Sequence, residues 1–512
     1  MSWKYETSLE RIKKHLATAG EIEIEKLVRD AELSTLLSET VCREIFGAHV
    51  YVDVPNFAKL ATEIDGEEYR RLIQAVHLYQ REVTRIVEGE DRFGGLRVHF
   101  QGPKLHALFF RPIDAAGELA TKAVLLQAVL REFTYTVFNP LFPSLENLDM
   151  SGGADIGNAI GTQDGMKGDR ELLFIGAPAN YAAKIITTAG QLCLTEHIYK
   201  ELPRKVQRLC SKEEDGNYSF SAIDRGTLQN LLSEAGVKWD PKASAGRLED
   251  DKRQFPLKDI QYSDAEVPID LDSLSITNNK RVTAASLFAD VDGFTAYIDA
   301  ATTKDEKKSA LRVLHAIRHE MAAVVKHDFN GLRIQYQGDR AQALFHLPKD
   351  DSSAIAEKAV SAAVGLQSSI EYTLRECLPE AAPLHLAVGI DVGPTLVSKL
   401  GIRGERDRIC IGLGVENAEK CQERCKGGEI GITSVVLDQL DNLTKQRFAH
   451  DVKRGISVAT GLTAEKVERM KKAAAYAGGS SVFVSSDRSG VSIRDAEGAG
   501  ARQVLPSKSY AD

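Results

Sequence analysis

The sequence is poor in the residues and patterns that mark several protein classes. Its seven cysteines are scattered, and only Cys421 and Cys425 lie close together. No second pair or nearby histidine completes a zinc set, so we expect reduced thiols and no disulfide scaffold. No run of about 18 apolar residues occurs, so no helix is expected to span a membrane. The first residues are charged and amphipathic rather than an apolar signal core, so the expected location is the cytoplasm.

An excess of positive charge is also missing. Lys and Arg total 65 against 73 Asp and Glu, which gives a net charge of -8. This balance argues against nonspecific nucleic-acid binding, which needs a basic surface. What remains is ordinary for a soluble globular protein, with 43% hydrophobic and 27% charged residues. A length of 512 residues corresponds to about three domains.

The chain contains a duplication. Residues 96–112 and 332–348 are identical at eight of seventeen positions, at an offset of 236. Residues 48–57 match 285–294 at an offset of 237, and residues 168–177 match 404–413 at 236. Three collinear matches at a period too long for a solenoid indicate two copies of one whole domain.

Both copies have the same order of predicted elements: a strand, a helix, a hairpin that turns at Gln-Gly, a second helix and a further strand. Strands mixed with helices predict a sheet with helices packed on it. We therefore divide the chain into an N-terminal helical lead-in, a first copy, a linker region, a second copy, and a C-terminal helix and tail, at residues 1–46, 47–210, 211–281, 282–440 and 441–512.

The second copy carries the clearest chemical motif. Asp290 ends an apolar strand and begins Asp-Val-Asp-Gly-Phe-Thr, and Asp339 lies at the tip of the Gln-Gly hairpin. Two carboxylates at adjacent strand ends suit hard divalent cations, which prefer oxygen ligands, and the carbonyl of Val291 is a further candidate ligand. The alternative is that each Asp only stabilises its own turn. Together in this motif they favour a metal site.

These residues resemble the catalytic domain of class III nucleotide cyclases, the adenylate and guanylate cyclase family. The family's motifs correspond to residues 290–295, to Gly338-Asp339 and to Gly389-Ile-Asp-Val-Gly393. The resemblance covers about residues 282–440 and extends more weakly, through the duplication, to about 46–200. It implies an α+β fold: tandem ferredoxin-like class III cyclase domains that form an intramolecular pseudo-dimer.

In this family the active site lies between two such domains, and the resemblance assigns its parts unequally to the two copies. The second copy keeps both metal-binding Asp residues but has Glu416 where the family has Asn. The first copy keeps Asp53, has Pro103 in place of the second Asp, and retains Asn180. The first copy is therefore degenerate in the metal motif, and one productive site is expected. A capping or surface role is the alternative for Asn180.

The first copy also has Lys184 at the position of the family's catalytic Arg. Lysine keeps the positive charge but lacks the bidentate fork of arginine. By resemblance, Asn180 and Lys184 stabilise the transition state, and two divalent ions, Mn²⁺ or Mg²⁺, bind in the second copy. The ribose 3′-hydroxyl then attacks the α-phosphate in line and pyrophosphate leaves.

The nucleotide needs further contacts. Phe294 belongs to the metal motif, and Arg403 and Arg406 belong to a basic cluster that suits a triphosphate. A solvated charged loop is the alternative for each arginine. The family's adenine-reading positions hold Gln335 and Ile409 in the second copy, and His99 and Leu173 in the first. Neither pair is the one expected for adenine or guanine, which argues against ATP and GTP.

The hairpin Arg333-Ile-Gln-Tyr336 resembles the Arg-x-x-Tyr signature of the pyrimidine cyclases of bacterial Pycsar antiviral systems. In that group UTP or CTP is cyclised on phage infection, and a separate effector protein reads the product. UTP is favoured here because of the fused two-domain architecture. The first copy has Phe100 in place of the Tyr, so the role of Tyr336 stays open, and packing in a strand explains either ring.

Two rival functions remain at this point. One is a purine cyclase, which makes cyclic AMP or cyclic GMP with unusual base contacts. The other is a catalytically silent pseudocyclase that binds a nucleotide as a regulator, which the decay of the first copy favours and the intact Asp290 and Asp339 oppose. Because one chain carries both halves of the site, a monomer suffices for activity, although a homodimer is possible.

Overall fold

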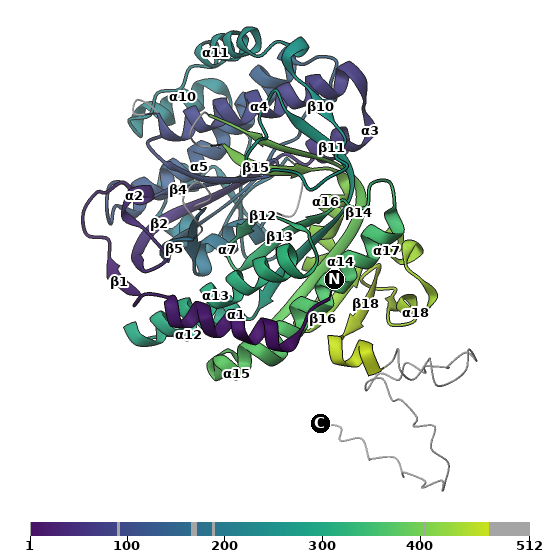
Figure 1. Cartoon of the computed structure of the whole chain (residues 1–512). Coiled ribbons are helices and arrows are strands. Elements are labelled where there is room, and N and C mark those ends of the chain that lie inside the picture. Colours follow the sequence, from purple (N-terminus) through teal and green to yellow (C-terminus); the bar gives the residue numbers. More distant parts are fainter. Residues whose placement is uncertain (1, 90–92, 165–170, 187–189, 403–405, 470–512) are drawn as a thin grey trace, which may run out of the picture. The chain divides into compact units, whose positions relative to one another are not determined.

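The computed structural model describes residues 2–89, 93–164, 171–186, 190–402 and 406–469. The chain divides into two units, Met1–Ala464 and Glu465–Asp512. All helices and strands labelled in Figure 1 lie in the first unit. Among the described residues, no helix has the length and apolarity to cross a membrane. The seven cysteines are free thiols, as expected.

The first copy builds one sheet, whose strands run in the order β3-β4-β2-β5-β7-β9-β8, with β1 added beside β2 and β6 beside β5. Strand β2 pairs antiparallel with both β4 and β5, and β5 pairs parallel with β7. Its strands are β1 (Glu23–Lys26), β2 (Val41–Asp53), β3 (Leu96–Gln101), β4 (Lys104–Phe109), β5 (Ser151–Asp164), β6 (Glu171–Ile175), β7 (Leu192–Leu194), β8 (Cys210–Lys212) and β9 (Tyr218–Phe220).

The second copy repeats this topology strand for strand, in the order β12-β13-β11-β14-β16-β18-β17, with β10 beside β11 and β15 beside β14. The inner order of each sheet is that of a ferredoxin-like fold, so the predicted tandem arrangement is confirmed. Its strands are β10 (Tyr262–Ser263), β11 (Asn279–Asp292), β12 (Leu332–Gln337), β13 (Arg340–Phe345), β14 (His385–Leu400), β15 (Asp407–Ile411), β16 (Glu429–Ile432), β17 (Ala449–Asp451) and β18 (Ile456–Thr460).

Long helices cover one face of each sheet, and a shorter helix packs on the other face. In the first copy α4 and α5 pack on β2 to β5, while α7 lies against the opposite face of β5 and β2. The helices up to residue 254 are α1 (Tyr5–Thr18), α2 (Leu33–Leu36), α3 (Asn56–Glu63), α4 (Gly66–Glu88), α5 (Ala116–Phe133), the π-helical turn η1 (Thr134–Phe138), α6 (Asn139–Leu141), α7 (Ala177–Lys184), α8 (Glu196–Glu201), α9 (Arg204–Gln207), α10 (Arg225–Glu234) and α11 (Pro241–Gln254).

The second copy follows the same plan, with α14 on one face of β11 and β14 and α16 on the other. A capping box of Thr303 and Glu306 starts α13. The remaining helices are η2 (Leu257–Asp259), α12 (Phe294–Ala300), α13 (Lys304–Ala323), η3 (Val324–Asp328), α14 (Ser352–Ser368), η4 (Ser369–Leu374), α15 (Arg375–Cys377), η5 (Pro379–Ala381), α16 (Leu413–Glu423), α17 (Ser434–Gln439) and α18 (Asn442–Lys445).

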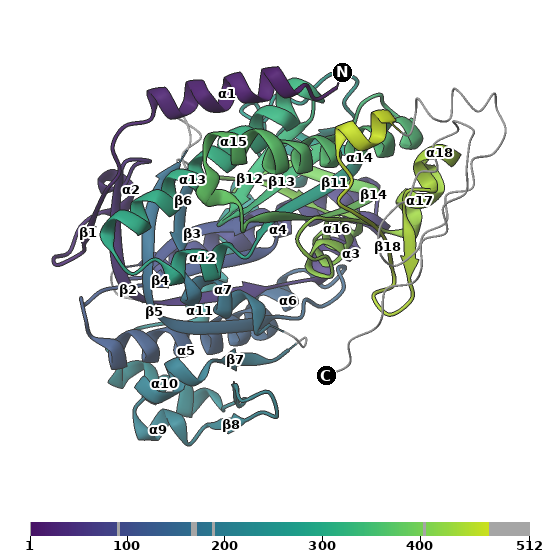
Figure 2. The same cartoon turned by 90° about the horizontal axis from the view of Figure 1, so that it is seen from below.

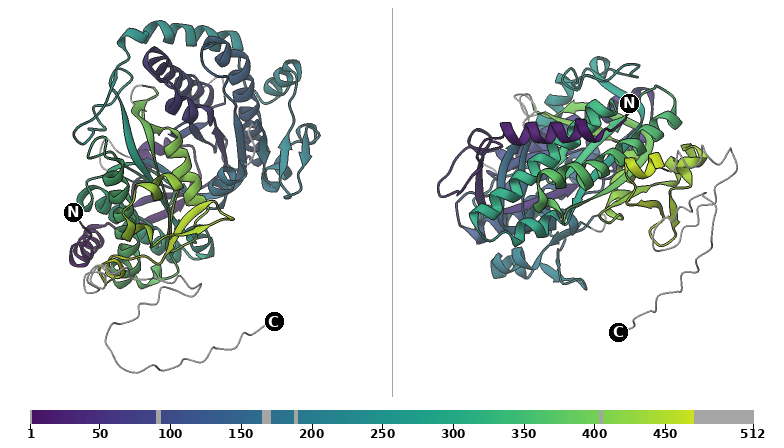
Figure 3. Two further views of the ribbon diagram at one scale, coloured as in Figure 1. Left: turned by 90° about the vertical axis from the view of Figure 1, so that its right-hand side faces the viewer. Right: turned by 60° about the horizontal axis from the view of Figure 1, so that its bottom comes forward.

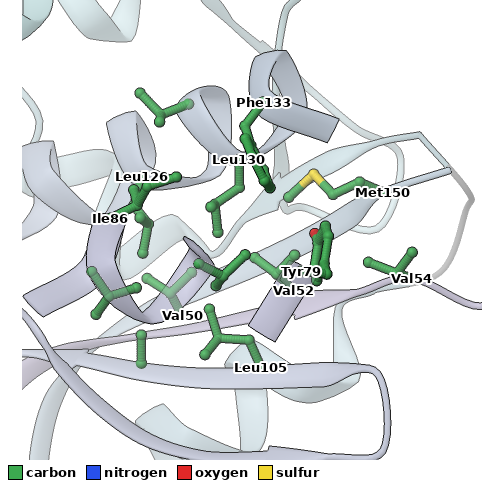
Figure 4. Packing of buried hydrophobic residues seen from close by; sticks show 14 of the residues in the cluster. Val50, Val52, Val54, Tyr79, Ile86, Leu105, Leu126, Leu130, Phe133 and Met150 are labelled. Carbon is green, nitrogen blue, oxygen red and sulfur yellow. The ribbon is translucent and has the colours of Figure 1, made fainter. Parts of the chain in front are cut away.

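The main core lies between the first sheet and its two long helices. Figure 4 shows Val50 and Val52 of β2 facing Tyr79 of α4 and Leu126 and Leu130 of α5. The same buried cluster continues into the second copy through apolar side chains of β14 and β15, namely Leu396, Leu400, Ile409 and Ile411. The two copies therefore share a core.

Segments outside the two repeats also join them. Helix α1 precedes the first copy but lies along the helices of the second (Figures 2 and 3). There Arg11 bonds Glu320 at 2.6 Å and Asp328 at 2.8 Å, and Trp3 donates to Ser369. The predicted linker region contains α10 and α11, which pack on α5 and α4. The division into domains stays a prediction.

Candidate active site between the two copies

Two half-buried carboxylates meet at one end of the second sheet. Asp290 is near the end of β11, and Asp339 follows Gly338 in the turn between β12 and β13. Gly338 has a φ of 71°, which glycine adopts readily. The antiparallel pairing of β11 with β13 places this turn beside the end of β11. Val291, whose carbonyl was a candidate ligand, is buried in β11 next to Asp290.

The charges of this pair favour a cation. Burial raises the pKa of Asp339 well above its ordinary range, and the neighbouring Asp290 raises it further. Burial also raises the pKa of Asp290, against the lowering effect of Arg340 and Lys184. Two carboxylates that lose hydration and repel one another suit a divalent ion, which usually binds one or two carboxylates together with substrate phosphates. Among the described residues, no group of three or more His, Cys, Asp and Glu side chains is arranged for a metal, so phosphate and backbone oxygens would have to complete the shell.

The first copy contributes the other two predicted catalytic residues at the same place. Asn180 and Lys184 lie four residues apart on α7, so they share one face of that helix. Asn180 donates a hydrogen bond from Nδ2 to Oγ1 of Thr295 on α12 of the second copy. The charge of Lys184 lowers the pKa of both Asp290 and Asp339. The structure thus brings together the four side chains that the sequence placed in two different copies.

The equivalent place on the other side of the interface is filled by the protein itself. A cavity of about 50 Å³ is lined by Asp53, Pro103 and Glu416. Glu419 binds Lys104 of the first copy at 3.2 Å and Arg340 at 2.6 Å. Burial alone would raise the pKa of Glu419, but these two cations hold it at about 2. The small volume and the ion pairs leave no room for a nucleotide.

A larger cavity of about 720 Å³ lies where the two sheets approach one another. Three of the predicted nucleotide-binding residues line it: His99, Tyr336 and Arg406. Phe294, in contrast, is 1% exposed and belongs to the core. Arg403 lies outside the described residues.

The Arg-x-x-Tyr hairpin makes contacts between the copies. Arg333 binds Glu171 at 2.8 Å, and the backbone N–H of Tyr336 donates to the same carboxylate at 2.8 Å. The hydroxyl of Tyr336 donates to the carbonyl of Arg318, whose guanidinium lies 3.8 Å from the centre of the tyrosine ring. These bonds tie Tyr336 to its own copy and to Glu171.

The duplication repeats this contact in reverse. Arg97 binds Asp407 at 2.5 Å, and the N–H of Phe100 donates to Asp407 at 3.0 Å. Glu171 and Asp407 are equivalent residues at the offset of 236, as are Arg97 and Arg333. Neither carboxylate was among the residues predicted for the site, although their equivalence in the two copies was a usable signal.

Two relatives match this chain over nearly its whole length. A uridylate cyclase of Pseudomonas aeruginosa is 30% identical, over 95% of this chain and 97% of the relative. The chain belongs to the class III nucleotide cyclase family. A uridylate cyclase of a Rhizobium species is 26% identical, over 90% of this chain and 95% of that protein.

Two further comparisons support the assignment to the class III cyclase family. The family model for the adenylate and guanylate cyclase catalytic domain matches residues 276–472, which lie over the second copy. The crystal structure of a class III adenylyl cyclase-like ATP-binding protein from Pseudomonas aeruginosa superimposes with a TM-score of 0.79 at 27% identity, over 92% of this chain and 99% of that one. The chain is accordingly a nucleotidyl cyclase, and cyclase domains of this family use divalent metal ions.

Proposed function

We propose that this cyclase converts UTP to 3′,5′-cyclic UMP and pyrophosphate. Two relatives that match over nearly the whole chain are uridylate cyclases, and the adenine-reading residues of the family are missing here. The observation that carries the proposal is the meeting of Asn180 and Lys184 of one copy with Asp290 and Asp339 of the other.

Asp290, Asp339 and the carbonyl of Val291 would hold the divalent ions, which supply charge to the triphosphate and acidify the 3′-hydroxyl when bound. The chain's own residues act on the α-phosphate. In the reaction a bond forms between the ribose 3′-oxygen and the α-phosphorus, and the bond from that phosphorus to the bridging oxygen breaks. The 3′-hydroxyl proton is lost and pyrophosphate leaves.

Lys184 and Asn180 would stabilise the charge that develops on the α-phosphate oxygens. A fixed cation and an amide donor act strongly in a partly buried site, because they need little reorganisation during the reaction. Thr295 accepts from Nδ2 of Asn180 and so sets the orientation of the amide. Arg406 lines the larger cavity and is a candidate contact for the nucleotide.

The cell-level role that we propose follows from the resemblance to Pycsar cyclases. The chain would generate a cyclic-nucleotide signal on phage infection, and a separate effector protein would read it. Cells that carry this gene with an effector gene should then restrict phage, and the Asp290→Ala variant should not.

The first test is incubation of the purified protein with Mn²⁺ and each of ATP, GTP, CTP and UTP, with products resolved by chromatography and mass. Cyclic UMP from wild type should fall at least about 1,000-fold in Asp290→Ala, because the variant loses a metal ligand. Asp53→Ala is the matched control, since Asp53 is the equivalent residue in the filled site, and it should keep activity within about threefold.

Other products distinguish the rival functions. Cyclic CMP would keep the pyrimidine class and change the base. Cyclic AMP or cyclic GMP would overturn the pyrimidine assignment, and ATP has specific interest because the structural relative is ATP-binding. If no nucleotide is turned over but one binds tightly, the chain is a regulatory pseudocyclase.

A further inference from the structure

A row of three rings crosses the first sheet beside the candidate active site. His99 of β3 lies opposite His106 of β4, and His106 lies opposite Tyr51 of β2. Tyr51 and His106 stack at 4.3 Å between ring centres, and His99 meets His106 edge to face at 5.3 Å. Directly opposed residues of antiparallel strands point to the same face of a sheet. The three side chains, called the ring row here, therefore form one surface.

This surface faces the helix that carries Asn180 and Lys184. The next residue in the row, opposite Tyr51 on β5, is Gly153. A Cβ at Gly153 would lie 2.2 Å from the carbonyl of Ala182, and Ala182 lies on α7 between Asn180 and Lys184. The ring row thus lies on the α7 side of the sheet.

The two ends of the row connect the parts of the site. At one end, His99 lines the cavity of about 720 Å³. At the other end, burial raises the pKa of Tyr51, and the charges of Lys104, Arg340 and Asp339 all act on this residue. The row therefore runs from the large cavity to the predicted metal ligands.

The second copy gives an internal comparison for this row. Its equivalent residues are Gln335, Gln342 and Phe288, which pair across the strands in the same way. Phe288 and Gln342 line the small filled cavity around Asp53 and Pro103. By the symmetry of the two copies, Tyr51 and His106 line the productive site, where histidine replaces glutamine.

His106 has an unmet hydrogen-bonding atom in this position. It is 2% exposed, and its Nε2 lies 3.0 Å from Nδ1 of His49. Its Nδ1 is buried with no hydrogen-bond partner among the described residues. Nε2 of His49 likewise has no partner among the described residues, so this histidine pair has free hydrogen-bonding capacity that a water or a substrate could satisfy. Burial, with the charges of His49 and His99, lowers the pKa of His106 well below its ordinary value, so the ring is neutral.

We propose, on the basis of the proposed function, that the ring row is the base-reading wall of the site and that Nδ1 of His106 accepts a hydrogen bond from N3–H of uracil. A neutral imidazole has one donor and one acceptor nitrogen. If Nε2–H of His106 donates to Nδ1 of His49, then Nδ1 of His106 is bare and accepts. Cytosine has a bare N3 and cannot donate there. In this proposal His49 accepts through Nδ1, and its own Nε2 also has no hydrogen-bond partner among the described residues. His49 is then a positioning residue, since the shared proton decides between UTP and CTP.

The test compares UTP and CTP turnover in variants that borrow residues from the second copy. His106→Gln should lower kcat/KM for UTP about 30-fold and reduce the UTP-to-CTP ratio at least about tenfold, because a site built to hydrogen-bond one group rejects its analogue strongly. His49→Phe, which leaves His106 in place but frees its tautomer, should reduce the same ratio about tenfold with a smaller effect on kcat. Gln342→His, the reverse change at the filled cavity, should leave both values within about twofold.

A second readout does not need turnover. In protein with ¹⁵N-labelled histidine, addition of a non-hydrolysable UTP analogue with Ca²⁺ should shift the Nδ1 signal of His106, and a CTP analogue should not. Wild-type protein that makes no cyclic UMP would refute the proposed function. If wild type makes cyclic UMP while His106→Gln and His49→Phe keep its UTP-to-CTP ratio, and the His106 signal does not move, the ring row is overturned and the cyclase assignment stands.

Discussion

The two copies have the same strand order and the same hairpin, and both keep the first Asp (Asp53 and Asp290) and the Lys (Lys184 and Lys420), yet they differ at the other two positions of the site. Where the second copy has Asp339, the first has Pro103, and where the first has Asn180, the second has Glu416. One interface site is therefore complete in its residue types, and the other is closed by the ion pairs of Glu419. A duplicated fold keeps its scaffold by packing, while each site is free to gain or lose single side chains.

The sharpest way to break this comparison is to remove the residue that the first copy supplies. We expect Asn180→Ala to lower kcat of the cyclase about 100- to 1,000-fold, which is the usual effect of losing one donor to a developing charge. The KM should change little, because the amide acts in the transition state. Steady-state kinetics with the substrate found in the first test would measure both values.

The matched control for Asn180 is the equivalent residue of the other copy, Glu416→Ala. It lies in the filled cavity and forms an ion pair with Lys420 on the same helix, so activity should stay within about twofold. Equal losses in the two variants would mean that both sites work, or that the effect comes from the interface as a whole.

A smaller effect is expected where the two copies are alike, at their equivalent arginine–carboxylate pairs. Arg333→Ala removes the arginine that lies 2.8 Å from Glu171, which keeps Arg318 at 3.7 Å and the N–H of Tyr336. Arg97→Ala removes the arginine that binds Asp407, which keeps the N–H of Phe100. Loss of one partner of a buried pair typically costs about 3 kcal/mol. Both arginines are buried, but the carboxylates keep some exposure, so we expect about 2 kcal/mol in each case.

Calorimetric melting temperatures would measure these two losses. A double-mutant cycle of Arg333→Ala and Glu171→Ala, singly and together, would isolate the coupling between Arg333 and Glu171. The expected result is a similar drop for Arg97→Ala and Arg333→Ala. A stability loss in only one of them would show that the paired contacts are not equivalent, despite their equal geometry.

The sequence predicted what is local to each copy. The offset of 236 and the order of elements identified two ferredoxin-like units, and the strand-end positions of Asp290 and Asp339 identified a carboxylate pair. These features depend on spacing along one stretch of chain. The position of α7, whose Lys184 acts on that pair through its charge and whose Asn180 bonds Thr295, came only from the resemblance, because no spacing relates two copies across an interface.

The same reason explains what the sequence could not predict. Tyr336 was a candidate for contact with the base. In the structure its hydroxyl donates to the carbonyl of Arg318, and its backbone N–H donates to Glu171. Of the ring row only His99 was named from the sequence, because Tyr51 and His106 are 55 residues apart and become neighbours only through strand register. The sequence of α1 likewise contained no pattern that predicted its packing on the second copy.

The last prediction concerns the loss of stability in acid, and it compares one buried position in the two copies. Burial lowers the pKa of His49 to about 3, and burial together with Arg97 lowers the pKa of His99 to about 3. The unfolded chain binds a proton at each of these residues below about pH 6.5. Their contribution to stability is therefore complete above pH 6.5 and is lost as the pH falls from 6.5 toward 3.

At pH 5 this linkage amounts to about 2 kcal/mol for each such histidine. His99→Gln, which copies Gln335 of the second half, removes one titrating group, so the fall in melting temperature between pH 7 and pH 5 should be smaller in this variant than in wild type. Gln335→His places an imidazole at the equivalent buried position and should make the fall steeper. An unchanged fall in both variants would mean that these sites hold the charged ring as well as the neutral one, so the acid sensitivity would have to arise elsewhere.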